Sequence, residues 1–211
     1  MMDVYKTLYQ IVDNYDYFYK GDDDSFVINE NLEFLMQKFN ANGKIETGYA
    51  MRDQSSPLLY SGGAGYLLSR SALKAIVHDG LEYPNGKPKC DTTEGPEDVR
   101  LAACARVVDV AQYDCHDAKG AKLFYNMKLE TKFDRFRWLA EKDVKSRPNW
   151  DYVSENHATF HYVDGSMQYV LEFVIYFVGH FLKHQLLRDP YNNNGTKMEP
   201  KIDCKRLLVN T

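Results

Sequence analysis

The sequence predicts an α/β protein with one folded domain. Runs of aromatic and β-branched residues at 17–20, 26–28 and 159–163 have the composition of short strands. Between these runs, apolar residues recur every three or four positions, which is typical of amphipathic helices. A chain of 211 residues, of which 44% are hydrophobic, is also long enough to bury a core.

The chain begins with a predicted helix, which precedes the first two strands. The spacing favours this helix over residues 3–15, with an apolar face formed by Val4, Leu8, Ile11, Val12 and Tyr15. A second helix is expected to begin at a cap formed by Asn29 or Asn31. It is expected to end at Asn42 and Gly43, because glycine readily adopts the left-handed conformation that ends helices.

The rest of the chain continues the alternation. A strand is expected near residues 48–51. Ser69 is expected to cap a helix whose inward-facing residues are Leu73, Ile76 and Val77. Pro96 opens another helix, since proline and acidic residues suit a first helical turn. A strand near 110–113 follows, and the last helix has a predicted apolar stripe of Met167, Val170, Leu171, Val174, Val178 and Phe181.

The charge of the chain argues against two classes of main partner. The formal net charge is −4 and the isoelectric point is about 5.9, without a block of Lys and Arg, which argues against nucleic acid or an anionic membrane as the main partner. The N-terminus has neither the basic nor the apolar region of a signal peptide. Glu172 and His180 interrupt the longest apolar run, so we expect no membrane anchor within this chain.

The four cysteines, Cys90, Cys104, Cys115 and Cys204, form no CxxC pair, which argues against a zinc site of the usual spacing. Their even number is compatible with disulfides and an oxidising compartment, and these observations leave the pairing open. Asn194 begins an Asn-Gly-Thr glycosylation sequon in a polar segment, where we expect a loop.

Three adjacent carboxylates, those of Asp22, Asp23 and Asp24, lie in the turn between the first two strands. Neighbouring negative charges repel one another, and Mg²⁺ or Mn²⁺ relieves the repulsion because such cations bind carboxylate oxygens and often phosphate oxygens as well. The turn is therefore either a metal site or a solvated acidic turn. His161, which alternates with aromatic residues on a later strand, is likewise either structural or a ligand.

Two further motifs also have a structural and a functional interpretation. Gly62, Gly63 and Gly65 allow the backbone to approach a ligand or to turn tightly, and their spacing is neither GxGxxG nor a P-loop. Glu97 and Asp98 suit the first turn of a helix, where interaction with the helix dipole alone explains them.

Four motifs follow one another along the chain: KGDDDSFVI at 20–28, YSGGAGYLLS at 60–69, EDV at 97–99 and FHYVD at 160–164. Their order and content resemble the core 1 β1,3-galactosyltransferase group, which is part of the fringe-like inverting glycosyltransferases of family 31. The resemblance extends over roughly residues 4–184, and the second and fourth motifs are its most specific parts.

The resemblance implies an enzyme that transfers galactose from UDP-galactose to the 3-hydroxyl of N-acetylgalactosamine on Ser or Thr, with inversion. It implies Mn²⁺ as the cofactor, with ligands from Asp22, Asp24 and His161. It also implies that Asp98 is the base that takes the proton of the acceptor hydroxyl.

The same resemblance assigns contacts with the substrates. Contacts with the nucleotide and the donor sugar are implied for Asp22, Tyr162, Gly62, Gly63 and Gly65. Contacts with the acceptor glycoprotein are implied for Glu97 and for Trp150, with Trp138 as the alternative aromatic platform. A disulfide between Cys90 and Cys104 is implied as well, which would stabilise the fold by roughly 3 kcal/mol.

The fold implied by the resemblance is the GT-A, Rossmann-like α/β fold, of which this chain would form the carboxyl-terminal portion. Members of the family carry a cytosolic tail, a membrane anchor and further strands before the acidic motif, so we expect an exposed sheet edge here. Residues 1–188 would form the partial catalytic domain and 189–211 a polar, flexible tail. Full-length members are type II proteins facing the Golgi lumen, and a homodimer is one assembly to be tested.

Two alternatives stay open. The family's adjacent cysteine pair and its aromatic acceptor stretch are not found at 146–156, so another fringe-like β1,3-glycosyltransferase is the first alternative. The second is an inactive paralogue, similar to the dedicated chaperone of this family. That chaperone lacks the metal-binding aspartates, whereas Asp22 and Asp24 are both found here.

Overall fold

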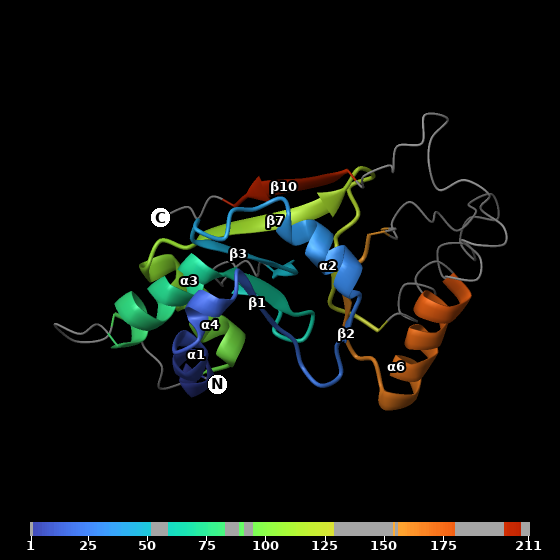
Figure 1. Cartoon of the computed structure of the whole chain (residues 1–211), viewed down its shortest axis with the longest axis horizontal. Coiled ribbons are helices and arrows are strands. Elements are labelled where there is room, and N and C mark those ends of the chain that lie inside the picture. The colour runs from blue at the N-terminus through green and yellow to red at the C-terminus, as the bar shows by residue number, and fades with distance from the viewer. Residues whose placement is uncertain are drawn as a thin grey trace.

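The computed structural model describes residues 2–51, 59–82, 89–90, 95–128, 154, 156–179 and 201–207. Within these ranges the protein is mixed α/β, as the sequence predicted, with helices packed around a central sheet (Figure 1). No helix in the described part of the chain combines the length and the apolar character needed to cross a membrane.

The central sheet has, among the described residues, the strand order β1-β6-β3-β7-β10. Its members are β1 (Tyr17–Lys20), β6 (Tyr66–Ser69), β3 (Ile45–Gly48), β7 (Ala111–Asp117) and β10 (Ile202–Arg206). Neighbouring strands are antiparallel except for β3 and β7, which are parallel. No described strand pairs with the outer side of β1, whose residues are all half-buried, so the expected open edge lies here.

Helices cover both faces of this sheet. One face packs against α1 (Met2–Tyr9), the short η1 (Val12–Asn14), α3 (Arg70–Lys74), its continuation η2 (Ala75–Glu82) and α4 (Glu97–Val107). The other face packs against α2 (Asn29–Met36). Alternation along β6 explains both contacts, because Tyr66 and Leu68 enter the first core and Leu67 enters the second.

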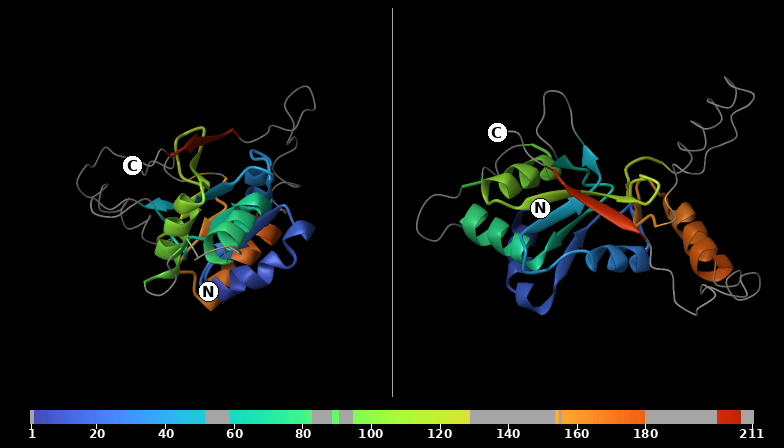
Figure 2. Two further views of the ribbon diagram at one scale, coloured as in Figure 1. Left: turned by 90° about the vertical axis from the view of Figure 1, so that its left-hand side faces the viewer. Right: turned by 90° about the horizontal axis from the view of Figure 1, so that it is seen from above.

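A smaller sheet lies beside the central one and contains β2 (Phe26–Val27), β9 (Thr159–Phe160) and β8 (Phe124–Tyr125). A further pair consists of β4 (Ala50–Met51) and β5 (Leu59–Tyr60). The long helix formed by α6 (Gly165–Glu172) and η4 (Phe173–Val178) lies at the side of the small sheet, away from α1, α3 and α4 (Figures 1 and 2).

Several predicted elements are confirmed, and others have different bounds. Ser69 caps α3, since its side chain accepts the backbone N–H of Ala72 at 3.1 Å. The first helix ends at Tyr9, and its buried residue is Tyr5, whereas three members of the predicted apolar face are exposed: Val4, Ile11 and Tyr15. The second helix ends at Met36 rather than at residue 42.

Two disulfides link separate elements of the fold. The predicted bond between Cys90 and Cys104 is confirmed, and it links the loop before α4 to that helix. A second bond joins Cys115 of β7 to Cys204 of β10. The segment predicted as a flexible tail therefore contains an edge strand that is held covalently. Trp138, Trp150 and Asn194 lie outside the described residues, so their predicted roles stay predictions.

Candidate active site

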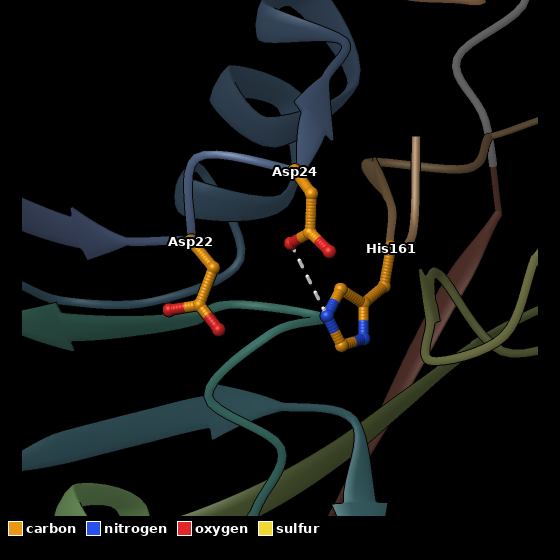
Figure 3. Close-up of side chains that lie close together, drawn as sticks. All are labelled: Asp22, Asp24 and His161. Carbon is orange, nitrogen blue, oxygen red and sulfur yellow. Dashed lines mark ion pairs between the residues drawn. The ribbon is translucent and has the colours of Figure 1, made fainter. Parts of the chain in front are cut away.

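Asp22, Asp24 and His161 converge from two distant segments (Figure 3). The two aspartates lie in the loop between β1 and β2, and His161 directly follows β9. One potential ligand atom from each residue lies within 4.8 Å of the others, and Nε2 of His161 is 3.3 Å from Oδ1 of Asp24. Asp22 is exposed, Asp24 half-buried and His161 buried, so the cluster opens to solvent on its carboxylate side.

Pairing between β2 and β9 brings these segments together. Phe26 faces Phe160 in the antiparallel register, which sets the residues before Phe26 opposite those after Phe160. The backbone N–H of Val163 extends this pairing, because it donates to the carbonyl oxygen of Asp24 at 2.8 Å. The aspartate loop and His161 are thus fixed by backbone hydrogen bonds.

A polar partner orients the His161 ring. Nδ1 lies 3.1 Å from Oδ1 of Asn126, an oxygen that also accepts the hydroxyl of Ser61. With Nδ1 as the donor, Nε2 has its lone pair free and directed toward Asp24, which is the tautomer that a metal ligand requires. Asn126 was not predicted as a residue of the site, since only the fold brings it to the histidine.

The glycine turn fits closely around side chains of the site. A β-carbon on Gly63 would lie 1.9 Å from Cε1 of His161, so the imidazole occupies the space that the missing side chain leaves. Gly65 has a φ of +78°, and a β-carbon there would collide with the Tyr19 ring. The hydroxyl of Ser25 donates to the Gly63 carbonyl at 2.6 Å and accepts from Asp22 N–H at 2.8 Å, which ties the aspartate loop to the turn.

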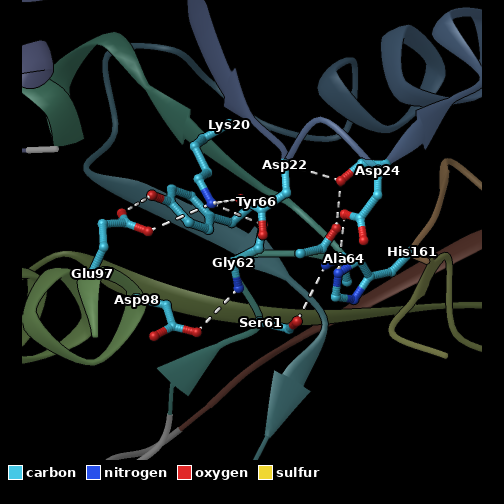
Figure 4. A network of polar contacts seen from close by, with 12 residues as sticks. Lys20, Asp22, Asp24, Ser61, Gly62, Ala64, Tyr66, Glu97, Asp98 and His161 are labelled. Carbon is cyan, nitrogen blue, oxygen red and sulfur yellow. Dashed lines mark hydrogen bonds and ion pairs between the residues drawn. The ribbon is translucent and has the colours of Figure 1, made fainter. Parts of the chain in front are cut away.

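Asp98 lies on the other side of the same turn. Its Oδ2 accepts the backbone N–H of Gly62 at 3.2 Å, and its Oδ1 accepts the N–H of Val99 at 2.9 Å. The N-cap of α4 is Pro96, without a capping side chain. Asp98 is therefore oriented by the glycine turn as well as by its own helix, and it lies on the flank of the turn away from Asp24 and His161 (Figure 4).

Glu97 faces inward rather than toward solvent. Its Oε1 accepts the hydroxyls of Tyr5 and Tyr66, and 15% of its side chain is exposed. Burial raises the pKa of both the Tyr5 and the Tyr66 phenol well above the ordinary range, so both remain protonated donors. This side chain connects α1, β6 and α4.

Lys20 joins the two halves of the site, although no role was predicted for it. Its ammonium group lies 2.5 Å from Oδ1 of Asp22, 3.2 Å from the Gly62 carbonyl and 3.6 Å from Oε2 of Glu97 (Figure 4). Its position next to the acidic motif could have indicated a role in the site. The contact with Glu97 could not have been predicted, because it depends on the tertiary fold.

Tyr162 presents an aromatic ring beside the cluster. The residue is 51% exposed, and its ring stacks on the His161 imidazole, with centroids 3.7 Å apart and an interplanar angle of 19°. Its φ of +57° is unusual for a residue with a side chain and costs of order 1 kcal/mol. An exposed ring held in this way is available to a ligand at the cluster.

The donor set of the cluster suits a divalent cation. Two carboxylates with one imidazole are compatible with Mn²⁺, which accepts both oxygen and nitrogen ligands. The Nε2 lone pair of His161 is available as a nitrogen ligand, and the carboxylates are open to solvent on the side from which a cation would enter. Asp23 is not part of the cluster, and its carbonyl oxygen accepts Nε2 of Gln168 at 3.0 Å.

Two surface hollows lie elsewhere and share no residue with the cluster. One of about 480 Å³ lies beside the ion pair of Asp16 and Arg70, next to Tyr17 and Phe39. The other, of about 390 Å³, is lined by residues that include Tyr9, Lys44 and His78. The candidate metal ligands thus lie on an open surface rather than in either hollow.

Comparison with known proteins supports a relationship to galactosyltransferases. The chain is 26% identical to a protein of Xenopus laevis named glycoprotein-N-acetylgalactosamine 3-beta-galactosyltransferase 1, over 206 aligned residues. The alignment covers 92% of this chain and 55% of the relative, so the chain spans about half the length of that protein. No protein-family model matches the chain.

Proposed function

We propose that this chain forms the metal-binding and acceptor-activating part of a β1,3-galactosyltransferase. In this proposal, galactose passes from UDP-galactose to the 3-hydroxyl of N-acetylgalactosamine on Ser or Thr, with inversion and with Mn²⁺ as cofactor. Similarity to the Xenopus protein supports the reaction class. The donor, the acceptor and the linkage are our inference from the motifs.

One observation carries the proposal: the turn at Gly62 and Gly63 separates a cation-binding cluster from an oriented carboxylate. Asp22, Asp24 and His161 lie near one side of the turn, and Asp98 accepts a hydrogen bond from Gly62 on the other. An inverting transfer needs these two functions on opposite faces of the sugar, because the base must act opposite the leaving group.

Each residue has a definite task in this reaction. Asp98, held by two backbone N–H groups, takes the proton of the acceptor hydroxyl as that oxygen attacks the anomeric carbon. Asp22, Asp24 and His161 would hold Mn²⁺, which when bound supplies positive charge to the diphosphate leaving group. Tyr162 offers an exposed ring to the nucleotide portion of the donor.

The proposal extends to the fold and the compartment. The central sheet, with its open edge at β1, is compatible with the carboxyl-terminal portion of a GT-A domain. Two disulfides suit an oxidising compartment such as the Golgi lumen. Contacts of Glu97 with the acceptor are less favoured, because both of its oxygens already have partners in Tyr5, Tyr66 and Lys20.

The experiment is a turnover assay with UDP-galactose and a peptide that carries GalNAc on Ser or Thr. We expect UDP release and transfer of galactose that require Mn²⁺ and are lost in Asp24→Ala. Unchanged UDP release without the cation, or full activity of Asp24→Ala, would contradict the metal assignment. Because the chain spans about half the length of the Xenopus relative, the assay is repeated with a longer form, in which the unaligned part of that protein is joined to this chain.

Transfer to an unrelated sugar acceptor, with no transfer to the GalNAc peptide, would favour another fringe-like β1,3-glycosyltransferase instead. Binding of Mn²⁺ without turnover in either the short or the longer form would indicate a non-catalytic paralogue.

A further inference from the structure

Lys20 is a shielded cation at the boundary of the site. It ends β1, and 16% of its side chain is exposed. An ammonium group has three N–H donors, and three acceptors surround this one: Asp22, the Gly62 carbonyl and Glu97 (Figure 4). Two of the three acceptors do not belong to the candidate cation cluster.

Because it contacts Asp22, Lys20 would compete with a divalent cation for the carboxylate of that residue. Asp22 offers its carboxylate to the cluster with Asp24 and His161, and the same carboxylate already accepts the Lys20 ammonium at 2.5 Å. Two cations near one carboxylate repel each other, and low exposure to water reduces the screening of that repulsion. A divalent cation that binds here must weaken the bond between Lys20 and Asp22.

We propose that Lys20 competes with the divalent cation for Asp22 and, once displaced, binds the diphosphate that arrives with that cation. This inference rests on the proposed function, because it needs a cation at the cluster. The Gly62 carbonyl and Glu97 retain the ammonium near the site after the exchange. Its released N–H is then available to a phosphate oxygen, which lysine binds as a compact point charge.

The exchange predicts a coupling between two ligands. Without an anion, the cation binds weakly, because it has to displace Lys20 and leaves the ammonium without its third acceptor. When a diphosphate is bound, a phosphate oxygen takes the place of Asp22 as the third acceptor of the ammonium group. Its negative charge also reduces the repulsion between Lys20 and the divalent cation. Each ligand therefore strengthens binding of the other by the same factor.

The test measures binding of Mn²⁺ to the full 211-residue chain by electron paramagnetic resonance of the free ion. Titrations are made without anion and with pyrophosphate, and the free concentrations are corrected for the Mn²⁺–pyrophosphate complex. In Lys20→Met we expect Mn²⁺ alone to bind roughly five- to tenfold more tightly than in the wild type. We expect the tightening that pyrophosphate produces to be smaller in this variant than in the wild type, because only the part that acts through Lys20 is lost.

Lys122→Met is the matched control. Lys122 also pairs with an aspartate, at 3.3 Å from Oδ2 of Asp114, and with a backbone carbonyl, at 3.2 Å from Ala50. It also lies over an aromatic ring, that of Tyr49, yet Asp114 is not part of the cation cluster. This variant should bind Mn²⁺ like the wild type, with and without pyrophosphate.

The outcomes separate this inference from the proposed function. The inference is overturned if Lys20→Met binds Mn²⁺ alone no more tightly than the wild type, or keeps the full effect of pyrophosphate. Lys20→Arg, which retains the cation, should keep the competition, and behaviour like that of Lys20→Met would also overturn it. If Asp24→Ala binds Mn²⁺ as well as the wild type, the metal site of the proposed function fails instead. Thermal unfolding of every variant verifies that it is folded.

Discussion

The imidazole of His161 occupies the space in which a side chain on Gly63 would lie. A β-carbon built on Gly63 would come within 2.0 Å of Nε2, the nitrogen that faces Asp24. Gly63 thus acts on the candidate metal site by leaving room for a ligand. The effect of Gly63 is steric, because glycine has no side chain that could bind the metal.

Replacement of Gly63 by alanine should therefore displace His161. We expect Gly63→Ala to weaken Mn²⁺ affinity by about tenfold or more, because disturbing the orientation of a ligand typically costs 10–100-fold. The measurement is a Mn²⁺ titration by electron paramagnetic resonance or calorimetry. Gly165→Ala is the control, since no heavy atom lies within 4 Å of a β-carbon there. Equal Mn²⁺ affinity of the two variants would contradict a ligand role for His161.

Replacement of Asp98 by asparagine should separate proton transfer from metal binding. The amide oxygen still accepts one of the N–H groups from Gly62 and Val99, but the side chain no longer takes a proton. We expect galactosyl transfer to fall by about 10²–10⁴-fold, which is the usual contribution of a general base. Mn²⁺ affinity should not change.

The control for Asp98 is Asp164→Asn, because Asp164 caps α6 and asparagine caps helices equally well. That variant should keep the activity of the wild type. Retention of most of the activity by Asp98→Asn would identify another residue as the base.

Much of the candidate site could be predicted because its determinants are local. The strands around Asp22 and Asp24 and the strand before His161 were expected from short aromatic and β-branched runs, and β1, β2 and β9 confirm them. Aromatic and β-branched residues favour strands, so such runs are visible in a single sequence. The grouping of the aspartates with His161 came into the prediction only through the family resemblance, and the pairing of β2 with β9 that brings them together was not predicted.

Contacts between distant residues could not be predicted. The apolar spacing of residues 3–15 directed Val4 and Ile11 inward, but Tyr5 is buried instead, because its hydroxyl has partners in Tyr66 and Glu97. The spacing of apolar residues cannot predict that a tyrosine is buried when its hydroxyl donates to a residue 92 positions away. The contacts of Lys20 with Gly62 and Glu97 were missed for the same reason.

The last helix shows a different limit. Val170 and Val174 of the predicted stripe are exposed, and the inward residues are Met167, Leu171 and Ile175. Met167 and Leu171 belong to the predicted stripe, but only the part of the stripe that faces the small sheet is buried. Strand β10 was missed because a polar segment gave no apolar signal, and Cys204 joins it to β7.

The hydrogen bond between Tyr5 and Glu97 should contribute measurably to stability. Tyr5→Phe removes a phenol that donates to a largely buried carboxylate, so we expect the free energy of unfolding to fall by about 1–3 kcal/mol. Urea unfolding measures the change. Tyr9→Phe is the control, since Tyr9 lies on the same helix and its hydroxyl has no hydrogen bond within the described part of the chain. Equal losses in both variants would show that the ring, and not the hydroxyl, stabilises α1.

Glu46 should make the stability of the fold depend on pH. Its side chain is 1% exposed in β3, and burial raises its pKa from 4.5 to about 7, although Gln112 donates to it at 2.9 Å. The folded state therefore binds this proton more tightly than the unfolded state does. The resulting stabilisation is complete below pH 4.5 and is lost as the pH rises to about 7.

Replacement by glutamine should remove this dependence, because the amide stays neutral and its oxygen can still accept Nε2 of Gln112. At pH 8 we expect Glu46→Gln to exceed the wild type by roughly 3 kcal/mol in the free energy of unfolding, and at pH 4.5 the two should be similar. Urea unfolding at a series of pH values measures the difference, with the exposed Glu33→Gln as control. A difference that is the same at pH 4.5 and pH 8 would mean that Glu46 does not carry the proton, and the pH dependence would then have to come from other groups.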